Sequence, residues 1–179
     1  MKKNLLSFAM LGVVLAACSG SDSSAPDNAK LITANDFESV EGWMPPTPAL
    51  SREQAHSGKF STRVDGNTEF SLGYSNLLGK VSPSKLRKIT LQAWVYLPSA
   101  KSQARLGVQV SDPVSGQEVF GDGITLTDQV KEYKKWVEVS KEITLPENIT
   151  ATQLLKVFLW RASASDAAYM DDIRLTIAE

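Results

Sequence analysis

The 179-residue sequence is poor in the residues that form covalent cross-links and soft-metal sites. It contains one cysteine, Cys18, and one histidine, His56. A single cysteine excludes an internal disulfide, so stability has to come from a hydrophobic core or from a bound metal. One histidine and no second cysteine also argue against zinc or another transition metal.

Charge is balanced and unclustered. The 19 lysine and arginine residues nearly match the 20 aspartate and glutamate residues, which gives a formal net charge of −1. Binding to nucleic acid normally needs a basic stripe or patch, and none stands out here. The composition therefore predicts no nucleic-acid partner.

The sequence also lacks the signatures of several enzyme classes. It has no Glu-x-Asp-x-x-Glu strand, which would place two carboxylates roughly 5 Å apart on one face, and no Gly-x-Ser-x-Gly elbow, phosphate loop or Cys-His pair. His56 has no Gln-x-His neighbourhood of the kind expected in a polysaccharide lyase. Asp171 and Asp172 are adjacent, and adjacent strand residues point to opposite faces. We therefore predict that the protein is not an enzyme.

The first 17 residues read as an export signal. Lys2 and Lys3 precede a short apolar run and small residues, and that run is too short to span a membrane as a stable helix. Leu15 to Cys18 resembles a bacterial lipobox, which implies cleavage before Cys18 and a diacylglycerol on its sulfur. The alternative is an ordinary secretory signal. We predict a lipoprotein of the bacterial cell envelope, anchored through Cys18, at the outer membrane.

Residues 18–30 are small and polar without hydrophobic periodicity, which is typical of a flexible tether. Residues 31–179 then have the length of one domain with a real core. Removal of residues 1–17 takes away Lys2 and Lys3 and leaves 17 basic against 20 acidic residues, a net charge of about −3.

Alternating apolar residues in this domain predict many short strands. The clearest is 88–97, where Ile89, Leu91 and Val95 share one face and Trp94 and Tyr96 the other. Other expected strands are 31–38, 49–54, 60–65, 69–76, 105–111, 136–145, 153–160 and 168–179, with 119–127 as a short strand pair or an extended loop. No convincing amphipathic helix is present. The pattern predicts an all-β domain, a two-sheet antiparallel β-sandwich.

The closing strand carries an unusual carboxylate. Strict alternation places Ile173, Leu175 and Ile177 on one face, and the same parity predicts that Asp171 points inward with them. A buried carboxylate is costly unless hydrogen bonds or a cation satisfy it. We therefore expect Asp171 to bind either an ion or a set of donors.

Several short motifs together resemble a known family. They are Phe37-Glu38 with Gly42-Trp43, residues 55–61 (Ala-His-Ser-Gly-Lys-Phe-Ser), Trp136 leading into residues 143–146 (Ile-Thr-Leu-Pro), and residues 169–175 (Tyr-Met-Asp-Asp-Ile-Arg-Leu). This set resembles the jelly-roll carbohydrate-binding modules of families 4, 9 and 22, in the galactose-binding-like superfamily. Members of that superfamily share these motifs whether or not they bind sugar, so the resemblance implies the fold more directly than the function.

The resemblance implies a structural calcium ion where the first and last strands meet. Carried over to this sequence, its ligands are Glu38 and Asp171, with Asp172 as a further candidate and backbone oxygens from Ser57 to Lys59. Calcium prefers hard oxygen ligands in irregular geometry. The alternative is that the carboxylates hydrogen-bond to backbone amides or pair with arginine and lysine.

The resemblance also implies a sugar-binding surface. Trp94 and Tyr96 are two residues apart with Gln92, opposite the main core, as a stacking platform requires. Gln109, Trp160 and Arg161 are candidates to extend it. Alternatively, a covering loop makes Trp94 and Tyr96 a second small core. Trp43 and Trp136 match motif positions that are structural in the family, and His56 is expected to be solvated in its turn.

Two functions remain open at this point. In the first, a lipid-anchored, non-catalytic protein binds a poly- or oligosaccharide and holds it near the membrane for polysaccharide-processing enzymes. In the second, a structural or protein-binding surface lipoprotein uses the same fold without a sugar site. Exposure of Trp94, Tyr96 and Trp160 distinguishes the two.

Overall fold

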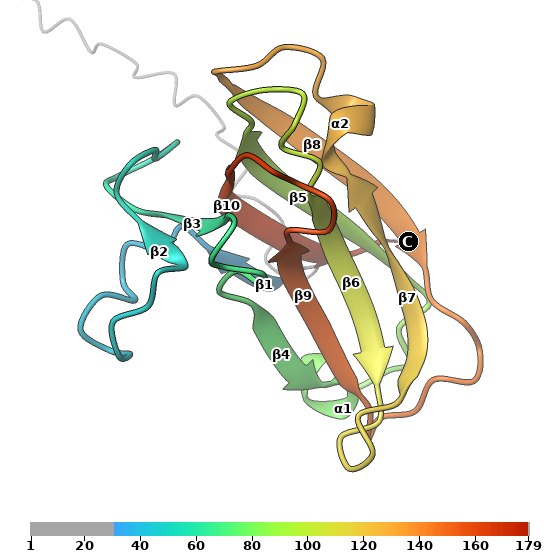
Figure 1. Ribbon diagram of the computed structural model, residues 1–179. Helices are drawn as coiled ribbons and strands as arrows, with labels where there is room; N and C mark the ends of the chain where they lie inside the picture. Colours follow the sequence, from blue (N-terminus) through green and yellow to red (C-terminus); the bar gives the residue numbers. More distant parts are fainter. Residues whose placement is uncertain (1–30, 179) are drawn as a thin grey trace, which may run out of the picture.

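The computed structural model describes residues 31–178, which form two antiparallel sheets packed face to face (Figure 1). The predicted all-β sandwich is confirmed. Two single-turn helices, α1 (Leu78–Val81) and α2 (Leu126–Gln129), were not predicted. The strands are β1 (Leu31–Asn35), β2 (Leu50–Ser51), β3 (Ser61–Val64), β4 (Tyr74–Leu77), β5 (Lys88–Tyr96), β6 (Arg105–Ser111), β7 (Glu118–Thr125), β8 (Trp136–Thr144), β9 (Leu154–Trp160) and β10 (Ala168–Ile177).

The larger sheet has the order β2-β3-β10-β5-β8, and β1 also pairs with β10. β3 and β1 pair with successive halves of β10, which is the longest strand. The smaller sheet has the order β4-β9-β6-β7 and lies in front in Figure 1. Since β5 and β6 belong to different sheets, their outward-facing side chains lie on opposite sides of the molecule.

The core lies between the sheets and follows the alternation of the sequence. β5 contributes Ile89, Leu91 and Val95, all fully buried, while its alternate residues are only partly buried. β6 and β9 contribute the opposite wall, including Leu106, Val110, Leu155 and Leu159. Complete burial of each such side chain stabilises the fold by about 1.5–3 kcal/mol.

The predicted signal peptide of residues 1–17 and the tether of residues 18–30, with Cys18, lie outside the described residues. Within residues 31–178 the two helices have four residues each, and no helix there is long and apolar enough to cross a membrane.

Candidate functional site

Asp171 lies on the outer face of the six-stranded sheet, and the inward orientation predicted from strict alternation is wrong. β10 pairs Asp171 with Trp94 and Arg174 with Gln92, so one extra residue is inserted in β10 between the two pairs. Asp172, within this bulge, has a φ of 45°. A bulge reverses the side-chain parity of a strand. Ile173 and Leu175 therefore keep their places in the core while Asp171 faces out.

Asp171 is nevertheless completely buried, because the segment of residues 52–60 covers it. Its Oδ2 accepts hydrogen bonds from the backbone N–H groups of His56 (2.8 Å) and Ser57 (3.2 Å), and its Oδ1 accepts one from Asp172 (2.8 Å). Burial raises the pKa of the Asp171 carboxyl, and the three N–H donors oppose that rise. This carboxylate ties the covering segment to the closing strand.

Glu38 holds the other end of the same turn. Its Oε1 accepts hydrogen bonds from the N–H groups of Lys59 and Phe60, both at 2.7 Å. Gly58, which precedes them, has a φ of 56°, and a side chain there would collide with the Glu38 carboxylate. The structure thus brings Glu38 and Asp171 to one turn, as the family resemblance implied, and Asp172 joins them by accepting a hydrogen bond from the Ser57 hydroxyl (2.8 Å).

The carboxylate oxygens at this turn are of the hard type that calcium prefers. Glu38 Oε2 accepts no hydrogen bond from the described residues, and Asp171 Oδ1 accepts only one. Residues 31–178 contain no group of three or more His, Cys, Asp or Glu side chains placed to hold a metal. Backbone carbonyl oxygens of the turn would therefore have to complete the ligand shell, an arrangement that calcium accepts.

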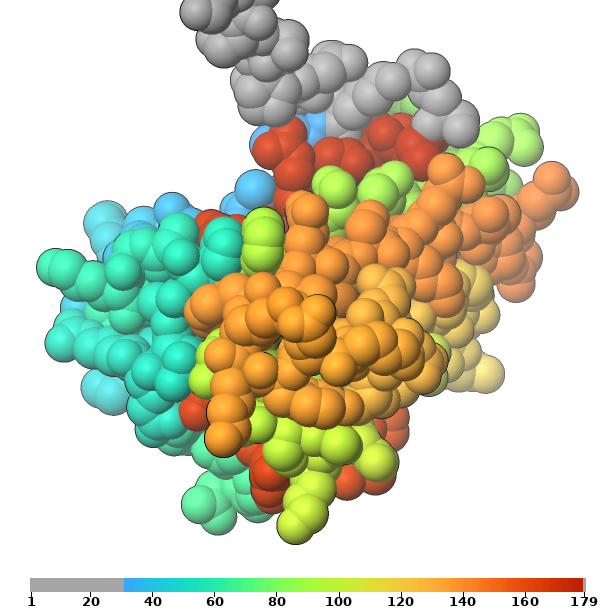
Figure 2. Space-filling view, turned by 90° about the horizontal axis from the view of Figure 1, so that it is seen from above, coloured from blue at the N-terminus to red at the C-terminus, as the bar shows by residue number. Residues whose placement is uncertain are grey.

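The aromatic residues of β5 are covered by the same segment. The His56 ring stacks on Trp94, with centroids 3.9 Å apart and planes 12° apart, and its Nδ1 lies 2.6 Å from Asp172 Oδ2. Trp136 contacts the edge of His56 and also Tyr96. Figure 2 shows the covering segment of residues 52–60 and the region of β8 side by side. His56 remains exposed, as expected for a turn residue, although its ring also packs on Trp94, and Trp94 and Tyr96 are half-buried beside it.

A polar network fixes the covering segment at a further point. The hydroxyl of Tyr169, on β10, donates to Glu53 Oε2 (2.6 Å), and Arg63 pairs with the same carboxylate (2.5 Å). Burial, followed by the hydrogen bond to Glu53, raises the pKa of Tyr169 to about 12. Tyr169 also packs edge-on against Tyr96. These contacts hold Tyr96 against Tyr169 and tie β10 to the covering segment.

The other predicted sugar-binding residues lie on the opposite side of the sandwich. Gln109 on β6 and Trp160 on β9 face out from the four-stranded sheet, whereas Gln92, Trp94 and Tyr96 face out from the six-stranded sheet. The single predicted surface is therefore wrong. Its two halves sit on separate faces because β5 pairs with β10 and β8, not with β6 or β9.

A groove of about 160 Å³ runs over the four-stranded sheet, and we call it the aromatic groove. Its lining residues are Arg105, Gly107, Val108, Gln109, Glu118, Gly121, Asp122, Phe158 and Trp160. Phe158 lies opposite Gly107 across the β6–β9 pair, and Gly107 in turn lies opposite Gly123 of β7. Because Gly107 has no side chain, the Phe158 ring can pack over it, and a Cβ atom at this position would lie only 3.3 Å from the ring.

Polar groups and further rings border this groove. Gln109 Nε2 donates to Glu118 Oε2 (2.6 Å), and Trp160 Nε1 donates to Glu69 Oε1 (3.4 Å). Phe70 lies nearly parallel to Trp160, with centroids 6.5 Å apart; the two side chains are 51% and 37% exposed. A pyranose has an apolar face and a rim of hydroxyls. Exposed rings can stack on such a face, and hydrogen-bonding side chains beside them can reach the hydroxyls.

Two aromatic residues of this surface, Phe158 and Phe70, were not among the predicted site residues. One predicted residue, Arg161, makes a different kind of contact. Phe158 alternates with Trp160 on β9, a signal that could have placed it there, whereas nothing in the sequence around Phe70 indicated its position. Arg161 follows β9 and donates its backbone N–H to the Glu69 carbonyl. Its Nε is buried and has no hydrogen-bond partner among residues 31–178.

The protein is a β-sandwich module with an exposed aromatic groove on its four-stranded sheet. A family model described as "Carbohydrate binding domain" (CBM_4_9) matches residues 29–164, more than half of the sequence. The chain belongs to this family of carbohydrate-binding domains, and the resemblance inferred from its motifs is confirmed. No curated protein sequence matches the chain.

Solved structures of family 22 modules share the fold. A xylan-binding domain of family 22 is 18% identical with a TM-score of 0.53, and the match covers 86% of this chain and 97% of that one. The C-terminal family 22 module of Clostridium thermocellum Xyn10B is 17% identical with a TM-score of 0.52 and the same coverage. A tandem of family 22 modules from Paenibacillus barcinonensis Xyn10C is 19% identical with a TM-score of 0.50, over 83% of this chain and 46% of that one.

Proposed function

We propose that this domain binds a polysaccharide without catalysing its cleavage, and that it does so through the aromatic groove. The observation that most directly supports this proposal is the partly exposed Trp160 beside the Phe158 ring. The neighbouring Gln109–Glu118 pair can exchange its hydrogen bond for hydrogen bonds to sugar hydroxyls. Family membership and the absence of the catalytic signatures sought in the sequence support a binding role.

Affinity electrophoresis of the full-length chain against a panel of soluble polysaccharides tests this proposal. Xylan is the first probe, because a family 22 domain of the same fold is described as xylan-binding. We expect Trp160→Ala to weaken retardation at least about tenfold, equivalent to ~1.4 kcal/mol. Tyr133→Ala is the matched control, because Tyr133 is exposed to the same extent (38% against 37%) and does not line the groove.

The panel also separates the two faces of the sandwich. A Trp94→Ala variant that keeps full retardation supports the aromatic groove, and one that loses binding while Trp160→Ala keeps it would move the site to the six-stranded sheet. If the wild-type chain is retarded by no glycan, the protein instead fits the alternative of a structural or protein-binding lipoprotein.

We further propose that calcium binds at the turn held by Glu38 and Asp171. A ligand that binds only the folded state at 100 times its Kd adds about 2.7 kcal/mol, so calcium should raise Tm by about 5–10 °C relative to a chelated sample. Glu38→Gln is the matched variant, since its amide oxygen can still accept from Lys59 and Phe60 while the charge is lost. That variant should show no calcium response. An equal Tm for wild type with and without chelator would remove the calcium site.

The cellular setting belongs to the same proposal. A diacylglycerol on Cys18 would tether the domain to the bacterial cell envelope, at the outer membrane, with residues 18–30 as the spacer. Bound polysaccharide would then be held close to the membrane, within reach of polysaccharide-processing enzymes.

A further inference from the structure

Trp43 is held almost entirely in solvent by an ordered turn. Its side chain is 90% exposed, so the structural role expected for it is wrong. The Trp43 N–H donates to the Val40 carbonyl (3.1 Å), and Gly42 supplies a φ of 82°. Arg52 pairs with Glu41 through both carboxylate oxygens, at 2.7 and 2.9 Å, which ties the turn to the covering segment.

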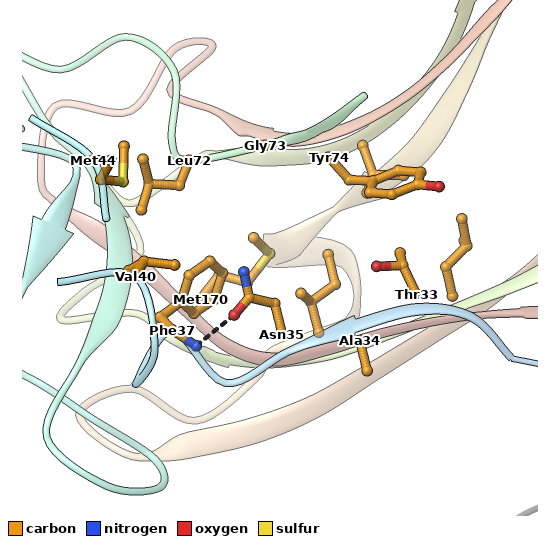
Figure 3. Close-up of a pocket in the computed structure, with 13 residues that line it drawn as sticks. Thr33, Ala34, Asn35, Phe37, Val40, Met44, Leu72, Gly73, Tyr74 and Met170 are labelled. Atoms are coloured by element: carbon orange, nitrogen blue, oxygen red, sulfur yellow. Dashed lines mark hydrogen bonds between the residues drawn. The ribbon is translucent and has the colours of Figure 1, made fainter. Parts of the chain in front are cut away.

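This turn borders a second cavity, which lies on the core side of the four-stranded sheet, opposite the face that carries the aromatic groove. The cavity has a volume of about 230 Å³ and opens between the edges of the two sheets. Figure 3 shows Met44, the residue after Trp43, beside Leu72, which Gly73 follows in the chain. The turn of Trp43 therefore reaches the edge of the four-stranded sheet.

Gly73 connects this edge to the floor of the groove. A Cβ atom at Gly73 would lie 3.3 Å from the Phe158 Cβ, so the two residues are in lateral contact. Across the sheet, glycines lie on both sides of Phe158, at Gly107 and at Gly73. Neighbouring strands are about 4.8 Å apart. A chain laid across them over Phe158 would leave the sheet above Gly73, at the edge where Met44 lies.

We propose that Trp43 is an outlying stacking position for the same polysaccharide, beyond the end of the aromatic groove. This inference rests on the proposed function of the groove and adds a chain-length requirement to it. An indole whose faces are both open offers an apolar platform for a pyranose ring. A short oligosaccharide would fill only the groove, whereas a longer chain would also reach Trp43.

The test compares short and long oligosaccharides of the panel polysaccharide that retards the wild-type chain, with xylo-oligosaccharides as the first probe, by isothermal titration. For Trp43→Ala we expect about five- to tenfold weaker binding of long chains and unchanged binding of short ones. Trp43→Tyr should restore most of the loss, because the ring remains. Val114→Ala is the control, since Val114 is equally exposed (95%) on the β6–β7 hairpin.

The outcomes distinguish a failure of the Trp43 position from a failure of the aromatic groove. Wild-type affinity of Trp43→Ala for long chains overturns the inference and leaves the groove intact. An equal loss of affinity for short and long chains also overturns the inference, as does a loss that Trp43→Tyr does not restore. Trp160→Ala should weaken both lengths, and a wild-type chain that binds no glycan overturns the groove and this extension together.

Discussion

Replacing Asp171 by alanine is expected to lower the free energy of unfolding by about 3 kcal/mol. The substitution removes the acceptor of three backbone N–H groups, at His56, Ser57 and Asp172, beneath the covering segment. Each buried donor left without a partner costs about 1–3 kcal/mol, reduced where water can reach it after the segment loosens. Urea denaturation followed by tryptophan fluorescence measures the loss, and His56 moving off Trp94 should alter the emission of the folded state.

The adjacent residue provides the control. Asp172→Asn keeps an amide oxygen that can accept from the Ser57 hydroxyl, and asparagine tolerates the φ of 45° at this position better than most residues. Its effect should stay within about 0.5 kcal/mol. Equal losses for the two variants would show that the bulge itself, and not the buried carboxylate, holds the covering segment.

Gly107→Val is expected to abolish glycan binding while the sandwich stays folded. A Cβ at Gly107 would lie 3.3–3.4 Å from the Phe158 ring, and the two methyl groups of valine would occupy the space beside it. The backbone at Gly107 has no positive φ, and valine is favoured in strands, so the unfolding free energy should change by no more than about 1 kcal/mol. Retardation on the binding polysaccharide should fall at least about a hundredfold, or ~2.7 kcal/mol.

A graded series separates blockage from misfolding. Gly107→Ala adds only the Cβ atom and should give an intermediate loss of retardation with a circular dichroism melt close to that of the wild type. A Gly107→Val variant that melts normally and still binds as tightly as the wild type would place the glycan elsewhere on the surface. The result would then direct attention to the opposite face, where Trp94 and Trp136 lie.

The strands could be predicted because their signal is local. In β5 the alternation of Ile89, Leu91 and Val95 with Trp94 and Tyr96 appears in the sequence and is reproduced in the burial of the strand. The Glu38 and Asp171 motifs could be linked to one turn only through the family resemblance, since 133 positions separate them in the sequence. Phe70 had no such support, because its place beside Trp160 depends on how its segment packs along β9.

The acidic candidates for an ion came from the family resemblance. The sequence alone was enough to predict that the domain is all-β and which residues of β5 face the core. Periodicity and composition carry that information within a single segment. Only the tertiary structure decided three further points. Strand pairing put Trp94 and Trp160 on opposite faces. One extra residue in β10 turned Asp171 outward, and the turn at Gly42 left Trp43 in solvent. These depend on register and on contacts between distant segments, which alternation within one strand does not encode.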